Sequence, residues 1–216
     1  MTVAPDGSPV DLYLLFPAAG EAERVHAAIP PRAAVLDLGC GVGRIAHELV
    51  RLGHPVVAVD ESREMLAHVR GAETVYARIE ELDLGRRFPC VLLASHLVNT
   101  ADKAQRRAFL ATCARHVAAD GVVLVERHEP NWVPEEGVRG QMGDVTIALE
   151  DVRIEPPHVA ATVRYEAGGQ TWRHPFDARL FDDEALDEEL RAAGLRLSRV
   201  LDERGTWVEA RLYSSA

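Results

Sequence analysis

Apolar and polar residues alternate along the first 126 residues in a pattern that predicts short buried strands separated by amphipathic helices. Capping residues mark helix ends: Gly53 follows one amphipathic segment, and Ser62 precedes the next. The expected strands lie at about 35–38, 55–60, 74–77, 89–96 and 121–126. The expected helices run from 44 to about 52, from 62 to about 71 and from 101 to 118. Such alternation is typical of a doubly wound, mostly parallel α/β sheet with helices on both faces.

After Pro130 the pattern changes to strands of alternating polarity. Residues 145–154 and 159–165 alternate at period two, and residues 167–170 contain the two glycines of a hairpin turn. These features predict a small antiparallel β insertion after the fifth strand, at about residues 139–178.

The chain ends on a predicted antiparallel hairpin. Asp182 can cap a helix, and strands follow it at 195–201 and 206–213. Together with the five parallel strands, this hairpin completes a seven-stranded sheet. With 216 residues, 47% of them hydrophobic, the chain is long enough for one such core, so we expect a single domain over residues 1–216.

Composition limits the partners and the location of the protein. The 34 acidic residues outnumber the 24 basic ones, giving a net charge of −10, and no basic patch is visible, so nucleic acid is not an expected partner. The apolar runs are shorter than the roughly 20 residues of a membrane span, and no secretory signal pattern is present. Three widely spaced cysteines match neither a disulfide framework nor a metal site. We therefore expect a cytoplasmic protein without a membrane segment.

A glycine loop directly follows the first strand. Gly39, Gly41 and Gly43 lack a Cβ, so the chain can turn sharply there and bring N–H groups close to a ligand. A dinucleotide fingerprint requires Gly-x-Gly-x-x-Gly, whereas Arg44 occupies the place of its third glycine. Asp60 ends the second strand, 17 residues after Gly43, where a carboxylate can accept hydrogen bonds from a ribose diol. The loop therefore predicts a nucleotide-like ligand, and its spacing argues against a dinucleotide.

The stretch from Val35 to Arg44, with Asp37 inside its strand, resembles motif I of the class I S-adenosylmethionine-dependent methyltransferases. The C-terminal hairpin is similar to theirs, and dinucleotide-binding domains lack it. This resemblance implies a Rossmann-like fold, S-adenosyl-L-methionine as the cofactor and S-adenosyl-L-homocysteine as the product. It also implies that the β insertion lies over the active site and that residues 1–30 form a lid segment, as in small-molecule methyltransferases.

The resemblance assigns further cofactor-binding positions one at a time. Met65 matches a position that packs on the adenine, with core packing as the alternative. Arg78 and Ile79 match positions beside the adenine, but the acid that the family usually has there is missing, so the partner of the adenine amino group stays open. Tyr13 matches a lid contact, with a hydrophobic plug as the alternative. The expected cofactor-binding residues are Tyr13, Asp37, Gly39, Cys40, Gly41, Gly43, Asp60, Glu61, Met65, Arg78, Ile79 and Ser95.

Two histidines are candidate catalytic bases, because each follows a strand at the end of the sheet where ligands bind. His96 ends the fourth strand and could take a proton from the acceptor, or it could only hydrogen-bond the backbone. His128 follows the fifth strand and is the second candidate; His174, in the insertion, could line the substrate pocket. We expect the remaining histidines on solvated surface: His26, His47, His54, His68, His116 and His158. No metal ligand set is expected.

The expected reaction is an in-line displacement, in which an O, N, S or C nucleophile of a small molecule takes the methyl group of the sulfonium. The donor is already activated, so the protein contributes mainly proximity, alignment and, for a weakly acidic acceptor, a base. Three alternatives remain: a protein that binds the cofactor without methyl transfer, a protein methyltransferase, and a nicotinamide-dependent oxidoreductase. The expected partner is a small-molecule acceptor, and the protein could be a monomer or a homodimer.

Overall fold

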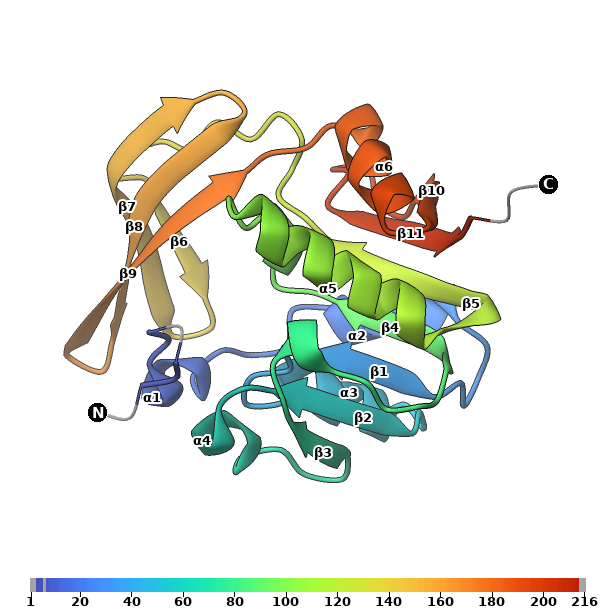
Figure 1. Ribbon diagram of the computed structural model, residues 1–216. Helices are drawn as coiled ribbons and strands as arrows, with labels where there is room; N and C mark the ends of the chain where they lie inside the picture. The colour runs from blue at the N-terminus through green and yellow to red at the C-terminus, as the bar shows by residue number, and fades with distance from the viewer. Residues whose placement is uncertain (1–2, 6, 214–216) are drawn as a thin grey trace.

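The computed structural model describes residues 3–5 and 7–213, and its main element is a seven-stranded sheet (Figure 1). The strand order from edge to edge is β10-β11-β5-β4-β1-β2-β3. The strands are β1 (Val35–Leu38), β2 (Val56–Asp60), β3 (Glu73–Tyr76), β4 (Phe88–Leu93), β5 (Val117–Glu126), β10 (Leu195–Val200) and β11 (Trp207–Leu212). Strands β1 to β5 are parallel, and β11 is antiparallel to both β5 and β10. The predicted mostly parallel sheet with an antiparallel C-terminal hairpin is confirmed.

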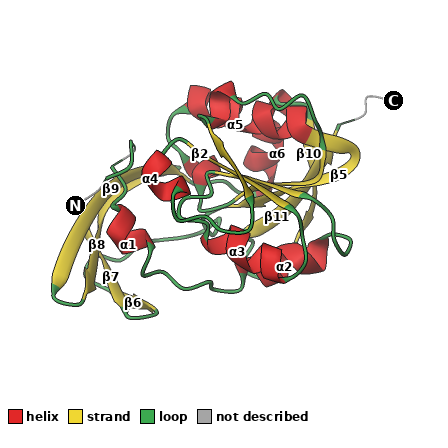
Figure 2. Ribbon diagram, turned by 90° about the horizontal axis from the view of Figure 1, so that it is seen from below, coloured by secondary structure: helices red, strands yellow, loops and turns green. Residues whose placement is uncertain are grey.

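Helices cover both faces of this sheet. The helices are α1 (Val10–Tyr13), α2 (Glu21–Ala28), α3 (Arg44–Arg51), α4 (Arg63–Leu66), α5 (Lys103–His116) and α6 (Asp183–Ala192), with 3₁₀ turns at Ile79–Glu81 and Leu97–Asn99. Figure 2 shows α2 and α3 on one side of the sheet and α5 and α6 on the other. Within residues 3–5 and 7–213, no helix is both long and apolar enough to cross a membrane.

Strand β1 shows why the sheet needs helices on both of its faces. Successive residues of a strand point to opposite faces. Leu36 and Leu38 join the apolar cluster that includes Phe109 of α5, and Val35 joins the cluster that includes Leu49 of α3. All four residues of β1 are buried, and burying a side chain such as Leu36 stabilises the fold by about 2 kcal/mol. The central strand is thus fixed from both sides, which holds the loop that follows it in place.

A second, antiparallel sheet lies beyond the end of the main one (Figure 1). Its strands, in the order β6-β7-β8-β9, are β6 (Arg139–Met142), β7 (Val145–Glu155), β8 (His158–Ala167) and β9 (Gln170–Arg179). A β-bridge between Thr100 and Ala178 connects it to the segment after β4. Leu12 of α1 packs with Val145 and Trp172 of this sheet. The sheet therefore forms a roof that is held by both the N-terminal segment and the main sheet.

Some predicted element bounds are wrong. The helix expected from Ser62 to about residue 71 ends at Leu66, although the Ser62 hydroxyl caps it by accepting the Met65 N–H at 3.1 Å. The guanidinium of Arg70 donates to the carbonyls of Ala67 and Val69, which a continuing helix would have used. Helix α5 stops two residues before the expected end at 118, because β5 begins at Val117 rather than at residue 121.

Candidate active site

A cavity of about 710 Å³ lies between the glycine loop of the main sheet and the roof. Its wall includes side chains at the ends of β1, β2, β4 and β5 and residues of β6 to β9. Both predicted bases and nearly every predicted cofactor-binding residue line it; the residues in question are Tyr13, Asp37, Gly39, Cys40, Gly41, Asp60, Glu61, Met65, Ile79, Ser95, His96 and His128. The structure thus gathers residues from most of the chain around one space.

Gly43 and Arg78 are the two expected residues that lie outside this wall. Gly43 precedes α3 with φ +86°, so it shapes the start of the helix. The Arg78 side chain is 54% exposed and forms ion pairs with Glu61 at 3.7 Å and with Glu80 at 3.1 Å. Ala77, rather than Arg78, joins Ile79 in the wall.

The glycine loop is held tightly by backbone hydrogen bonds. The N–H groups of Gly39 and Cys40 both donate to the carbonyl of Val59 at 2.9 Å, and Gly43 N–H donates to Cys40 O at 3.0 Å. Gly39 has φ +73°, and a Cβ there would lie 2.6 Å from Leu97 Cδ1. Gly41 has φ +56° and open space where a Cβ would be. Only residues without a side chain fit this turn without strain.

Asp37 is a buried carboxyl in the cavity wall, 2% exposed. Its Oδ2 atom has no hydrogen-bond partner among the described residues. Burial raises the pKa of Asp37 to about 7; the Arg44 charge opposes this rise and the Asp60 charge adds to it. An unpartnered buried carboxylate oxygen fits a cationic ligand, and S-adenosylmethionine carries both an ammonium and a sulfonium.

Asp60 is fixed at the carboxyl end of β2. Its Oδ2 accepts the Gly41 N–H and its Oδ1 accepts the Ser62 N–H, both at 2.8 Å. The side chain therefore connects the glycine loop to the start of α4 and presents its carboxylate to the cavity. The contact of Asp60 with the ribose stays a prediction.

Apolar residues form the part of the wall beside α4. Met65 is buried and packs with Val10, Val42 and Tyr13. Its contact with the core and its place in the wall coexist, so the two alternative readings of Met65 do not exclude each other. Burial raises the pKa of the Cys40 thiol strongly, which keeps the thiol protonated, so Cys40 acts here as a small neutral side chain.

Ser95 and His96 follow β4 in the left-handed conformation, with φ +55° and +58°. Two non-glycine residues in this region are strained, and strain of this kind gathers at functional sites. The Ser95 N–H donates to Glu126 Oε2 at 2.7 Å. The imidazole of His96 has a backbone hydrogen bond with Arg127, whereas its Nδ1 has no partner in the described part of the chain. Burial lowers the pKa of His96, although Glu126 and the Arg127 contact oppose this effect.

His128 stacks on His96, with 4.1 Å between ring centroids and 14° between planes. The backbone N–H of His128 donates to Asn99 Oδ1 at 2.8 Å, and Asn99 Nδ2 donates to the Arg179 carbonyl at 2.7 Å. Burial, and then the neighbouring His96, lowers the pKa of His128 to about 3. Both rings are therefore neutral at pH 7.

Sequence reasoning missed several residues of this wall. Trp132 stacks on His128 at 4.6 Å, and Phe176 lies 6.2 Å from both rings. Asn99, 1% exposed, connects the loop after β5 to the end of β9. Trp132 follows β5 by a few residues, and an aromatic residue just beyond a strand end is the one signal that could have indicated it.

Arg44 is a further cavity residue whose role the glycine spacing alone did not predict. Its Nη1 donates to Glu21 and, at 3.5 Å, to the carbonyl of Pro17. Burial disfavours the Glu21 carboxylate, but the hydrogen bond and charge of Arg44 prevail and lower the pKa of Glu21. This pair joins α2 to α3 beside the cavity.

Two histidines expected on solvated surface are buried instead. His54 Nδ1 lies 2.9 Å from Ala33 O, and its Nε2 lies 2.8 Å from His26 Nδ1. His116 bonds to Thr112 O at 2.8 Å through Nδ1 and accepts the Leu84 N–H at 3.1 Å. The sequence does not show these roles, because Ala33 O and the Leu84 N–H belong to segments distant in the chain.

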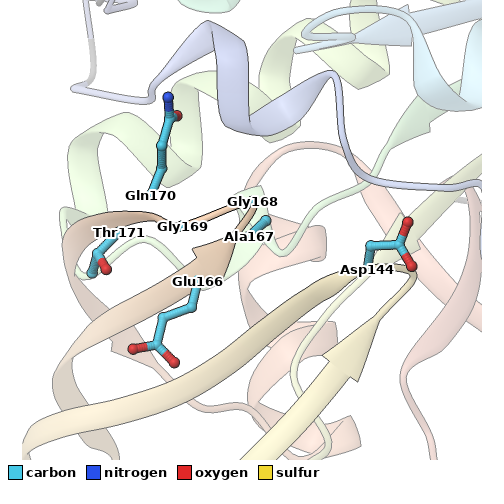
Figure 3. Close-up of a pocket in the computed structure, with 7 residues that line it drawn as sticks. All are labelled: Asp144, Glu166, Ala167, Gly168, Gly169, Gln170 and Thr171. Atoms are coloured by element: carbon cyan, nitrogen blue, oxygen red, sulfur yellow. The ribbon is translucent and has the colours of Figure 1, made fainter.

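A second hollow, of about 430 Å³, lies at the turn between β8 and β9. Figure 3 shows Glu166, Gln170 and Thr171 pointing in different directions from this turn, with Asp144 beyond them. No set of side chains converges there, so we place the active site in the larger cavity. Among the residues that the structure describes, no group of three His, Cys, Asp or Glu side chains could hold a metal ion.

Residues 35–121, which contain the glycine loop, Asp60 and His96, match the family described as "Methyltransferase domain". This part of the chain is therefore similar to methyltransferase domains. The fold of the chain agrees with that of the amino pentose methyltransferase CalS10 from Micromonospora echinaspora, solved with S-adenosylmethionine bound. The CalS10 structure matches with a TM-score of 0.69 at 24% sequence identity, and the match covers 91% of this chain and 90% of CalS10.

Two curated relatives of this chain are named for different acceptor atoms. One is the dTDP-3-amino-3,6-dideoxy-alpha-D-glucopyranose N,N-dimethyltransferase of Streptomyces fradiae, 33% identical over 55% of this chain and 47% of the relative. The other is the ubiquinone biosynthesis O-methyltransferase of Bradyrhizobium diazoefficiens, 30% identical over 45% of this chain and 41% of the relative. The chain thus spans less than half the length of these relatives.

Proposed function

We propose that this chain is an S-adenosylmethionine-dependent methyltransferase that acts on a small-molecule acceptor. One observation carries the proposal: a single cavity is lined by the glycine loop, by Asp60 and by His96. The methyl donor, bound at the glycine loop, and an acceptor, bound beside His96, would thus share one space.

The chain's own residues fit the cofactor. Asp60 would accept hydrogen bonds from the ribose diol, and the unpartnered oxygen of Asp37 would face the cationic methionine part. Met65 and Ile79 would contact the adenine from the apolar wall. When bound, the cofactor supplies an activated methyl group, so the protein needs mainly to align the acceptor and exclude water.

His96 is the base that the geometry favours. A backbone carbonyl can only accept, and Nδ1 has no partner among residues 3–5 and 7–213, so the contact with Arg127 leaves the ring proton on Nε2 and the lone pair on Nδ1. Nδ1 can then take the acceptor's proton. His128, with its pKa lowered to about 3, is a weak base and serves to orient the His96 ring through stacking.

We further propose a small-molecule partner, a cytoplasmic location and a lid segment, from the charge, the cysteines and the N-terminal aromatic residues of the chain. The net charge of −10 supports a neutral or cationic small molecule over nucleic acid. The three cysteines are free, which supports the cytoplasm. Tyr13 and Phe16 contact each other edge to face, and Phe16 reaches Tyr165 of the roof, which supports a lid role for residues 1–30.

Calorimetry of the whole chain with S-adenosylmethionine and, separately, with NAD tests the cofactor. We expect binding of the first and none of the second; binding of NAD alone would overturn the proposal. Release of S-adenosylhomocysteine in the presence of acceptors then tests methyl transfer. Tight cofactor binding without turnover on small molecules or peptides would indicate a binding protein instead.

A further inference from the structure

A short turn after β3 brings a carboxylate to the cavity, next to a proposed adenine contact. Ile79 and Glu80 are neighbours in this 3₁₀ turn, and both line the cavity. The chain enters the turn beside Asp60, because the Ala77 N–H donates to the carbonyl of Asp60 at 3.1 Å. From α5, the Thr112 hydroxyl donates to the carbonyl of Ile79 at 2.8 Å. The turn that carries Glu80 is thus held close to the residue that would bind the ribose.

The same turn packs against the glycine loop. A Cβ on Gly39 would lie 2.6 Å from Leu97 Cδ1 and 3.6 Å from Ile79 Cδ1, so both side chains lie beside this glycine. Leu97 and Ile79 line the cavity together with Phe109 of α5, which is 5% exposed. An adenine in this part of the cavity would therefore contact apolar side chains, with the carboxylate of Glu80 beside them.

One oxygen of the Glu80 carboxylate is engaged by the protein. Its Oε1 accepts a hydrogen bond from Arg78 Nη2 at 3.1 Å and a longer one from Gln105 Nε2 at 3.4 Å. The side-chain oxygen of Gln105 accepts the Thr100 hydroxyl at 3.0 Å, which leaves the amide N–H groups to face Glu80. Contacts from two segments therefore orient the carboxylate.

The other oxygen of Glu80 is open to a ligand. Among the residues that the structure describes, no group donates to Glu80 Oε2, and the side chain is 20% exposed in the cavity wall. An ionised carboxylate only accepts hydrogen bonds, so it needs a donor. The exocyclic amino group is the one donor on the adenine of S-adenosylmethionine, because the free ring nitrogens only accept.

The side chain of Arg78 does not suit this role. A guanidinium donates hydrogen bonds and cannot accept one from an amino group. Arg78 also lies outside the cavity wall, where it pairs with Glu61 at 3.7 Å and with Glu80 at 3.1 Å. Its position instead allows it to hold the Glu80 carboxylate from outside the cavity.

We propose that Glu80 selects the adenine base, with its Oε2 accepting a hydrogen bond from the exocyclic amino group of S-adenosylmethionine. This inference rests on the proposed function. Hypoxanthine carries a carbonyl oxygen in place of that amino group, and the lone pairs of this oxygen and of the carboxylate repel each other. Glu80 thus makes the cofactor site specific for adenine, and Arg78 and Gln105 position its carboxylate.

Calorimetry of the whole chain with S-adenosylhomocysteine and, separately, with S-inosylhomocysteine tests this selectivity. We expect S-adenosylhomocysteine to bind the wild type about tenfold or more tightly, as is typical of a hydrogen bond to a charged group. Glu80→Gln keeps the shape of the side chain, but its amide can accept from the adenine amino group or donate to the hypoxanthine carbonyl. In this variant the two affinities should lie within about threefold of each other.

Glu81→Gln is the matched control, because Glu81 is the exposed neighbour in the same turn and does not line the cavity. It should keep the wild-type affinity for each compound. Equal binding of the two compounds by the wild type, or an unchanged affinity ratio in Glu80→Gln, would overturn the assignment of Glu80 and leave the proposed function standing. If neither S-adenosylmethionine nor S-adenosylhomocysteine binds the wild type, the proposed function itself is wrong.

Discussion

The imidazole rings of His96 and His128 stack with 4.1 Å between their centroids, although the two residues follow different strands. The stack covers one face of His96, and the Nδ1 atom of this ring is buried without a hydrogen-bond partner among the described residues. Asn99 fixes the backbone of His128 and also the end of β9, so the roof and the stack are positioned together. The candidate base is thus oriented by its neighbours rather than by a carboxylate.

Replacement of His96 tests its role as base. His96→Gln should lower turnover about 10²- to 10⁴-fold on any acceptor that the wild type methylates, because the proton acceptor is lost while S-adenosylmethionine affinity is kept. Burial lowers the pKa of His96 below 6.5, so with saturating S-adenosylmethionine the wild-type kcat/KM for the acceptor should fall only as pH drops below about 6.5, when the ring becomes protonated. Initial rates across pH measure both.

His128→Phe is the matched variant, because it keeps a flat ring in the stack and removes the second imidazole. We expect it to retain most of the turnover. Equal losses in both variants, or full activity of His96→Gln, would show that His96 is not the base.

Asp60 should contribute directly to cofactor affinity. Asp60→Ala should weaken S-adenosylmethionine binding about tenfold or more, because hydrogen bonds to a charged group contribute roughly 1.5 to 3 kcal/mol and the glycine loop also loses the anchor at Gly41 N–H. Glu73→Gln, at an exposed carboxylate on the edge strand, is the control and should bind normally. Calorimetry measures both, and unchanged affinity in Asp60→Ala would remove Asp60 from the site.

Asp37 should make cofactor binding depend on pH. With its pKa raised to about 7, the free protein holds a proton on Asp37 below pH 7, and a cationic ligand binds best to the ionised form. S-adenosylmethionine affinity should therefore fall as pH drops from 8 to 6. Asp37→Asn should bind more weakly at pH 8 and lose this dependence; a wild-type affinity that is flat across this range contradicts the prediction.

The same group should affect the stability of the ligand-free protein. The ordinary pKa of the carboxyl is 3.8, so between about pH 4 and pH 7 the folded state holds a proton that the unfolded state has lost. The free energy of unfolding should therefore decrease as pH rises through this window. Between pH 4 and pH 8, the free energy of unfolding of Asp37→Asn, measured in urea, should rise by on the order of 3 kcal/mol relative to that of the wild type. Parallel pH profiles of the two proteins would show that the carboxyl is not protonated on folding.

Two glycine substitutions should separate folding from binding. Gly39→Ala should destabilise the fold by about 1 to 3 kcal/mol, because φ is +73° and the new Cβ would lie 2.6 Å from Leu97 Cδ1. Gly41→Ala should cost only about 1 kcal/mol, since space is open there, yet its methyl group would enter the cofactor site and weaken S-adenosylmethionine binding. Urea unfolding and calorimetry measure the two effects, and the opposite ranking in unfolding would contradict the loop geometry.

Local signals made the cofactor end of the site predictable. The strand, the glycine loop and Asp60 lie within 26 residues, and each is recognisable from residue type and spacing. The bounds of α4 were not predictable in this way, because the Arg70 side chain and His47 Nε2 take backbone groups that the sequence pattern assigns to a helix. A competing hydrogen bond outweighs a weak helical preference.

The acceptor end depends on contacts between distant segments. Asn99 bonds to Arg179, 80 residues away, and the bridge from Thr100 to Ala178 sets the roof over the main sheet. Trp132 belongs to an irregular loop, where no periodicity indicates which way a side chain points. The side chains of such residues line the cavity only in the folded protein, where the antiparallel sheet lies over the end of the main sheet.

The sequence by itself determined the fold class, the glycine loop and the position of Asp60, because hydrophobic period, turn chemistry and strand ends are local properties of the chain. The tertiary structure alone decided that His96 Nδ1 is buried without a partner in the described part of the chain, that Asp37 is buried enough to raise its pKa to about 7, and that Trp132 and Phe176 lie beside His128. Burial and stacking depend on which segments meet, and only the folded chain brings them together.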